Sequence, residues 1–175
     1  MKQLIFLIFP LFLFSQSENE KPKLYTNTNL FEFYANKESN YSNLVVEKYR
    51  GVGLEINSFH GIFILKRFAL SLGVGVSFTI SDEYMSLPIV GDLKWYSDDY
   101  GNGSYLFINT GRNLKLGNFK AGQSSKMGIG TTIDSNEDIQ YILEIYLKSK
   151  ELTLNDKTNF NYQTTSIGVA FGIKF

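Results

Sequence analysis

The chain of 175 residues contains no cysteine, three prolines and a single histidine. The lack of cysteine excludes disulfides, thiolate metal sites and the N-terminal lipid anchor of a lipoprotein. Seventeen acidic residues balance seventeen basic ones, so no surplus of positive charge favours binding to nucleic acid. No apolar run approaches the roughly 20 residues that a membrane-spanning helix needs. These absences leave strands as the main candidate elements.

The first seventeen residues have the pattern of a secretory signal peptide. Lys2 forms a short basic region, residues 4–14 are apolar except for Pro10, and Ser15 and Ser17 offer small residues for cleavage. The alternative is an uncleaved anchor, although the apolar run is short for one. We expect a signal peptide at 1–17 and one domain over 18–175.

Aromatic residues and glycine are abundant, with 11 tyrosines, 15 phenylalanines and 15 glycines, which favours strands and tight turns. The last thirteen residues alternate strictly. One face carries Ile167, Val169, Phe171, Ile173 and Phe175, and the other carries Ser166, Gly168, Ala170, Gly172 and Lys174. An apolar face opposite a small or polar face is typical of a strand between lipid and a polar barrel interior.

Similar alternation predicts eight strands. They cover residues 25–35, 46–62, 68–80, 86–96, 104–112, 124–133, 139–149 and 163–175. Short connections at 63–67, 97–103 and 134–138 alternate with longer polar ones at 35–45, 113–123 and 150–161, the short loop at 81–85 being an exception. The pattern predicts an all-β fold, an eight-stranded antiparallel up-and-down transmembrane β-barrel in the bacterial outer membrane with both termini periplasmic.

Alternation also predicts which charges point inward. They are Glu55, Asp92, Lys94, Lys126, Glu144, Lys148 and Lys174, joined by Glu32. Because side chains just fill an eight-stranded barrel, we expect these charges to pair across strands as a structural network without an open pore. A proton or ion path is the alternative.

Aromatic residues are expected to form girdles at both ends of the apolar band. The periplasmic set is Phe63, Phe68, Trp95, Tyr105, Tyr141, Phe171 and Phe175, and the outer set is Tyr49, Phe78, Tyr84, Phe160 and Tyr162. The parity of strand 104–112 stays open, because Leu106 and Ile108 compete with Tyr105 and Phe107 for the outward face.

Two segments carry a resemblance to a known family. Residues 57–63 lead into Leu72-Gly73-Val74-Gly75-Val76, and residues 87–96 form a strand that contains Pro88. Together with the terminal Phe175, this region of about 46–175 resembles the porin-like outer-membrane β-barrel domain family. The resemblance implies a small monomeric barrel without catalytic residues. It also implies that Phe175 belongs to the assembly signal that the barrel-insertion machinery reads.

No motif indicates an enzyme, a cofactor or a metal. His60 falls at the expected periplasmic end of its strand, which argues against acyl transfer on surface lipid. The segment 134–138 begins like a calcium loop, but Ile139 and Ile145 stand where the turn glycine and the bidentate glutamate belong. The paired glycines at 51–53 and 73–75 lie inside strands, so they are not nucleotide loops.

We therefore expect a non-enzymatic outer-membrane barrel that acts in envelope integrity or in surface interaction. Its expected contacts are membrane lipid, the insertion machinery and a protein or glycan at the adjacent loops 35–45 and 150–161, since binding residues concentrate on loops of a rigid scaffold. Two alternatives stay open: an accessory subunit of a larger outer-membrane complex, and a soluble lipocalin-like barrel that binds a ligand.

Overall fold

The structure is a computed structural model that describes residues 24–41, 51–80, 84–114, 121–136, 139–155 and 160–175. The expected signal peptide lies outside the described residues. In chain order the elements are β1 (Tyr25–Tyr41), β2 (Val52–Leu65), β3 (Phe68–Thr79), β4 (Tyr84–Tyr96), the 3-10 turn η2 (Asp99–Gly101), β5 (Ser104–Leu114), β6 (Gly122–Asn136), β7 (Ile139–Asn155) and β8 (Phe160–Lys174).

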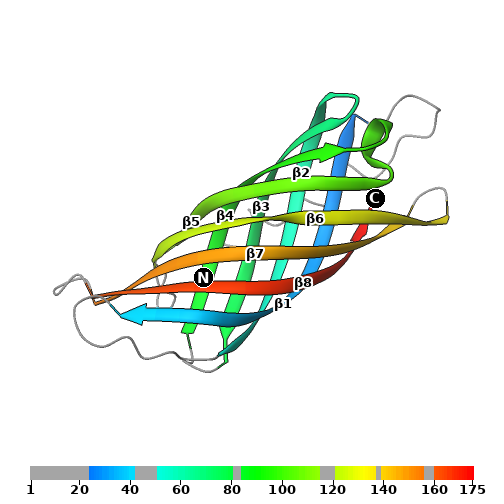
Figure 1. Cartoon of the computed structure of the whole chain (residues 1–175). Helices are drawn as coiled ribbons and strands as arrows, with labels where there is room; N and C mark the ends of the chain where they lie inside the picture. The colour runs from blue at the N-terminus through cyan, green and yellow to red at the C-terminus, as the bar shows by residue number, and fades with distance from the viewer. Residues whose placement is uncertain (1–23, 42–50, 81–83, 115–120, 137–138, 156–159) are drawn as a thin grey trace, which may run out of the picture.

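The eight strands form one closed barrel in which each strand pairs antiparallel with its neighbours in the sequence. Closure is made by β1 and β8, which pair from Thr28 opposite Lys174 to Tyr41 opposite Tyr162 (Figure 1). The predicted all-β, up-and-down, eight-stranded barrel is therefore confirmed. Among the described residues, no helix is both long enough and apolar enough to cross a membrane.

The barrel has two unlike ends. Leu24 and Phe175 lie at one end, here called the termini end, together with the C-terminal ends of β2, β4 and β6. The C-terminal ends of β1, β3, β5 and β7 lie at the opposite end, here called the loop end. Several strands run further toward the loop end than the sequence indicated: β1 continues to Tyr41 and β7 to Asn155. The expected second strand at 46–62 lies partly outside the described residues, and β2 itself covers Val52–Leu65.

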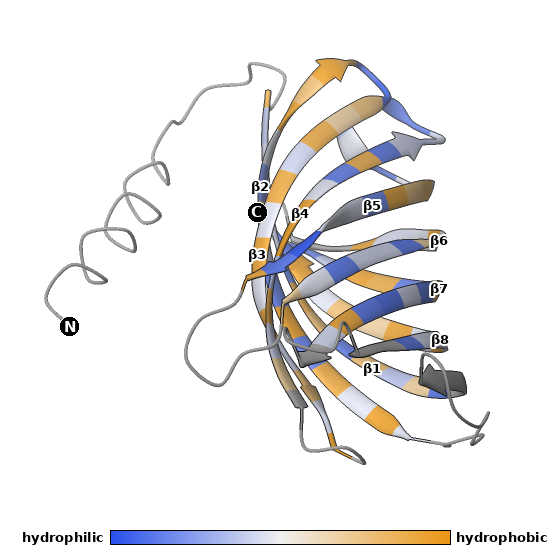
Figure 2. Cartoon of the chain, turned by 90° about the vertical axis from the view of Figure 1, so that its left-hand side faces the viewer, coloured by the Kyte–Doolittle hydropathy of each residue, from blue (hydrophilic) through white to orange (hydrophobic). Residues whose placement is uncertain are grey.

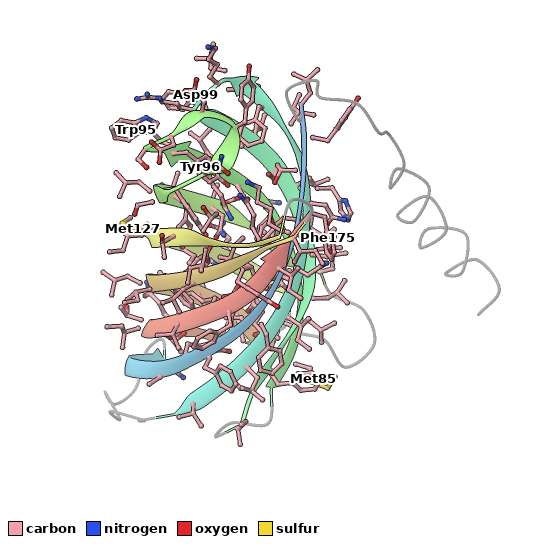
Figure 3. All side chains as sticks on the ribbon, turned by 90° about the vertical axis from the view of Figure 1, so that its right-hand side faces the viewer. Met85, Trp95, Tyr96, Asp99, Met127 and Phe175 are labelled. Carbon is pink, nitrogen blue, oxygen red and sulfur yellow. The ribbon has the colours of Figure 1, made fainter. Side chains whose placement is uncertain are left out.

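Apolar side chains cover the outside of the barrel and polar ones fill the inside. On β3, Leu70, Leu72 and Val74 are exposed, whereas Ala69 and Ser71, which alternate with them, are buried. Figure 2 shows the resulting alternation of orange with white and blue along the strands. In Figure 3, Trp95 and Met127 point away from the barrel and Tyr96 points into it. A strand presents successive side chains to opposite faces, so one alternating sequence produces both surfaces.

The structure settles the parity of β5 and corrects two predicted girdle residues. Leu106 and Ile108 are exposed, whereas Tyr105 and Phe107 are buried in the interior. The prediction that Phe63 and Tyr105 belong to the periplasmic girdle is therefore wrong, because both side chains are buried in the lumen. Both occupy inward positions, because the alternation is unbroken in β2 as far as Phe63 and throughout β5.

The other described girdle residues of the termini end lie outside the barrel. Trp95, Tyr141, Phe171 and Phe175 are exposed, and Phe68 stacks on Trp95 with ring centroids 6.2 Å apart. Phe78 is exposed toward the loop end. Tyr49 and the side chains of Tyr84, Phe160 and Tyr162 lie outside the described part of the structure.

Inward glycines make room for the large rings of the interior. A Cβ at Gly73 would collide with the ring of Phe59, and one at Gly168 would collide with the ring of Tyr146 and with the carbonyl oxygen of Phe33. Glycine at these inward positions therefore relieves crowding in the narrow barrel.

Candidate functional site

The barrel interior holds the residues that the sequence singled out. All seven predicted inward charges and Glu32 are at least 95 % buried: Glu32, Glu55, Asp92, Lys94, Lys126, Glu144, Lys148 and Lys174. They come from β1, β2, β4, β6, β7 and β8. Charged groups this deeply buried need partners of opposite charge or hydrogen bonds, and each of the eight has at least one.

Five of these side chains form a middle cluster: Glu32, Asp92, Lys94, Lys126 and Glu144. The ammonium of Lys126 lies 2.7 Å from Glu32 Oε1 and 3.6 Å from Glu144 Oε2. The ammonium of Lys94 lies 3.2 Å from Glu144 Oε1 and 3.8 Å from Asp92 Oδ2. The two lysines thus alternate with three carboxylates, and the cluster connects β1, β4, β6 and β7 across the lumen.

Aromatic rings enclose the middle cluster. The Tyr105 hydroxyl donates to Glu144 Oε1 at 2.8 Å. The ammonium of Lys94 lies 4.9 Å from the ring centroid of Tyr105, and that of Lys126 lies 4.8 Å from the ring centroid of Tyr146. Cations over ring faces gain further stabilisation where water is excluded. Sequence alone does not indicate this role for Tyr105, because it leaves the parity of strand 104–112 open.

A second ion pair lies on the loop-end side of the cluster, where Lys148 contacts Glu55. Asn57 joins the two layers, since its Nδ2 donates at 2.8 Å to both Glu32 Oε1 and Glu55 Oε1. Glu144 and Lys148 lie two inward positions apart on β7, and each pairs with other strands rather than with the other. The expected cross-strand pairing is therefore what the structure shows.

Lys150 is an interior residue that the sequence placed in a loop. It is 4 % exposed, and its ammonium donates to Ser77 Oγ at 2.9 Å. The prediction of a loop over 150–161 is wrong at this point, because β7 continues to Asn155. Lys150 lies two residues after the inward Lys148, and this spacing indicates an inward side chain. The strand is not recognisable as such here, because polar residues such as Glu151 occupy its outward face.

At the termini end the interior is closed by rings and a turn. Lys174 donates to the carbonyl oxygen of Gly101 at 2.7 Å and to Gln140 Oε1 at 2.9 Å. Its ammonium also lies 5.3 Å from the ring centroid of Tyr96. Just outside, the Arg67 guanidinium donates to Asp99 Oδ1 at 3.2 Å, and this hydrogen bond lowers the pKa of Asp99. The η2 turn therefore closes this end of the lumen.

His60 lies on the outside of β2, not in the lumen. Its Nε2 is 3.3 Å from Ser58 Oγ, two residues earlier on the same face, and Asn27 lies directly opposite His60 on β1. Ile56 and Ile62 flank this pair on the exposed face. A histidine and serine in contact satisfy only part of a nucleophile arrangement, which also needs an orienting group and oxyanion donors.

The charged side chains of the interior mostly contact one another. Among the residues that the structure describes, no group of three or more histidine, cysteine, aspartate or glutamate side chains could hold a metal ion. The side chains of 134–138, compared above with a calcium loop, lie outside the described residues. Each lysine of the middle cluster already contacts two carboxylates, so the cluster acts as a set of internal cross-links.

Comparisons with known proteins give a weak likeness of fold. No family model matches the chain, and no curated protein matches it. Among solved structures, the chain is similar to the outer membrane protein AlkL, determined by solid-state NMR in DMPC lipid bilayers. The sequence identity is 14 %, the TM-score is 0.44, and the match covers 91 % of this chain and 90 % of AlkL. Membership of the porin-like family stays a prediction.

The middle cluster predicts a large cost for removing one partner. Lys126→Met leaves Glu32 without its ammonium and should lower the free energy of unfolding by about 3–5 kcal/mol, the typical cost of leaving a buried charge unpaired. The double variant Glu32→Gln/Lys126→Met should lose less than the sum of the single variants. Urea unfolding in detergent micelles, followed by the fluorescence of the single tryptophan Trp95, measures the free energies of unfolding of the single and double variants.

The matched control is Lys66→Met, which removes an ammonium from the exposed Lys66–Asp99 pair at the termini end. This variant should unfold like the wild type, because water replaces an exposed partner. Additive losses in the double variant, or equal losses for Lys126→Met and Lys66→Met, would contradict a coupled network.

Proposed function

We propose that this protein is a bacterial outer-membrane barrel that spans the bilayer and carries out no catalysis, with a role in envelope integrity or in surface interaction. The observation that carries the proposal is the distribution of polarity. Ionised side chains fill the interior, whereas large apolar side chains such as Leu72, Met127 and Ile129 are more than half exposed outside. A barrel in water would place these groups the other way round.

Bilayer physics supports the same placement. Hydrocarbon offers no partner to backbone polar groups, so strands can cross a membrane only when every edge is paired. The β1–β8 pairing meets this requirement. Exposed Trp95, Tyr141 and Phe175 lie toward the termini end and Phe78 toward the loop end, consistent with aromatic girdles at two interfaces.

The interior contacts favour a structural role over transport. An ion path would need charges that exchange partners, but Lys94 and Lys126 each bridge two carboxylates and Lys148 contacts Glu55. At the termini end, Phe63, Tyr96 and Tyr100 pack together with ring centroids about 6 Å apart and obstruct the lumen. We therefore propose a closed lumen that keeps the barrel rigid and monomeric.

We propose that both termini are periplasmic and that the loop end faces outward, with the terminal Phe175 acting in assembly. The loop ends of β1 and β8, from which the β1–β2 and β7–β8 connections start, lie side by side, because Tyr41 pairs with Tyr162. The structure shortens both connections: Asn40, Tyr41, Glu151, Asn155 and Phe160 lie in strands. Residues 42–50 and 156–159, which contain Asn43, Asp156 and Lys157, lie outside the described residues.

The alternatives differ in what they require of the surface. A soluble lipocalin-like carrier needs an apolar interior for its ligand and a polar exterior. The buried charges argue against the first requirement, and the exposed apolar side chains argue against the second. An accessory subunit of a larger complex would use the same barrel, and co-purification from detergent would reveal its partner.

A charge in the apolar band should destabilise the barrel in lipid. Ile145→Lys places an ammonium on the exposed middle of β7 and should cost about 2–4 kcal/mol in phosphatidylcholine vesicles, as expected near a bilayer midplane. Leu65→Lys is the control, since exposed Leu65 ends β2 at the termini end, where the cost should be about 0–1 kcal/mol. Equal stabilities of the two variants, or a wild type that stays monomeric without detergent, would contradict the membrane assignment.

Surface interaction through the loops makes a separate prediction. Replacing residues 42–50 by a shorter polar linker and 156–159 by Asn-Gly should leave the barrel folded, because Asn-Gly suits a two-residue hairpin turn. The unboiled protein should still migrate as the folded form on a gel, whereas partner capture from detergent extracts should be lost. Capture of every partner by the doubly shortened barrel would show that the loops do not bind them.

A further inference from the structure

The lumen changes in chemistry along its length. Aromatic rings fill the termini end, and ion pairs fill the middle. Toward the loop end a layer of short hydroxyl and amide side chains surrounds one ammonium. We call this layer the loop-end ring; its members are Asn36, Ser77, Ser86, Asn113, Ser124, Lys150, Thr164 and Ser166, all at least 93 % buried. Every strand except β2 contributes to it.

The strand registers make the ring contiguous. Ser77 lies opposite Ser86, and Lys150 lies opposite both Ser124 and Thr164. Ser166 lies opposite Asn36 and donates to its Oδ1 at 2.7 Å. Residues opposite each other on neighbouring antiparallel strands have Cβ atoms about 4.5–5.5 Å apart. These paired side chains therefore lie beside one another on the inner wall of the barrel.

The charge of Lys150 has no direct counter-charge. Within the described part of the chain, no carboxylate lies within 4.0 Å of its ammonium, whose hydrogen bond goes to Ser77. The nearest charged layer, Glu55 with Lys148, is neutral as a pair. The middle cluster has three carboxylates for two lysines, but those groups contact one another. Lys150 is therefore the one charged side chain of the loop-end ring, and no described carboxylate contacts it directly.

Other members of the ring lack hydrogen-bond partners. Ser86 Oγ and both polar atoms of the Asn113 amide are buried without a partner among the described residues. Buried polar groups in folded proteins are nearly always hydrogen-bonded. Ser86 adjoins Ser77, the residue that holds Lys150. The ring thus combines an ammonium with unused hydroxyl and amide donors.

We propose that the loop-end ring binds a phosphate group. The ammonium of Lys150 would supply the charge, and the Ser86 hydroxyl and the Asn113 amide would donate to separate phosphate oxygens. Phosphate matches this set because it accepts several charge-assisted hydrogen bonds at once, and it would offset the single positive charge. The site adds a ligand class to the proposed barrel and does not depend on the loops binding a partner.

Titration of the folded barrel with inorganic phosphate tests the site. Calorimetry in a non-ionic detergent should show saturable binding, and phosphate should raise the temperature at which the folded gel band disappears, because a ligand specific for the native state stabilises it. Lys150→Met should weaken binding at least tenfold. The control Lys174→Met removes a buried ammonium at the termini end, which already has two oxygen partners, and should bind phosphate like the wild type.

Two further arms complete the test. Ser86→Ala and Asn113→Leu, which keep Lys150, should each weaken binding several-fold, and they decide the outcome if Lys150→Met does not fold. Micelles doped with phosphatidic acid then identify the source: competition with inorganic phosphate indicates a lipid phosphate, and its absence a soluble one. A folded, membrane-inserting barrel that binds no phosphate, or whose binding survives in every ring variant, overturns the inference and leaves the proposed function intact.

Discussion

Pairing between β1 and β8 is the interaction on which the rest of the structure depends. Without it, both strands would present a row of unpaired backbone groups, which is costly in water and prohibitive in hydrocarbon. The pairing spans most of both strands, with a single register shift between Asn36 and Glu38. In the closed barrel, each strand residue points either to the outer surface or into the narrow interior.

Closure converts a simple alternation into a set of long-range contacts. Lys126 meets Glu32, which is 94 residues earlier in the chain, and Lys148 meets Glu55 from 93 residues away. These partners share a lumen only because the barrel is closed. The interior charges therefore report on the complete fold, and they discriminate strongly against a shifted register, which would turn lysine and glutamate toward the apolar surface.

Sequence patterns predicted the strands well where one face was apolar throughout. The alternation of β3 and the inward Asp92 and Lys94 of β4 could be read directly, and the structure places them as expected. The alternation pattern misses a strand where its outward face turns polar. In β7 this happens beyond Leu147, and the pattern therefore wrongly predicts a loop at Lys150. Phe63 and Tyr105 were misplaced because an aromatic ring suits either surface, and only the register decides between them.

The pairing of charges could not be read from the sequence at all, since a strand pattern shows which way a side chain points but not which residue it meets. The same limit hid the loop-end ring, whose members are short polar residues from seven strands with no local motif. The outward residues can be predicted from composition and alternation. The contacts between inward residues can be predicted only when the registers of the strands are known.

The absence of cysteine allows a direct test of the inside-out arrangement. Single cysteines placed at consecutive positions 143–149 of β7 can carry spin labels in barrels reconstituted into lipid vesicles. Power-saturation measurements should show that spin labels at 145 and 147 are highly accessible to oxygen, which concentrates in lipid. Labels at 144, 146 and 148 should be poorly accessible both to oxygen and to a water-soluble nickel chelate. High access of 145 and 147 to the nickel chelate would show that the apolar surface faces water, and would contradict the account.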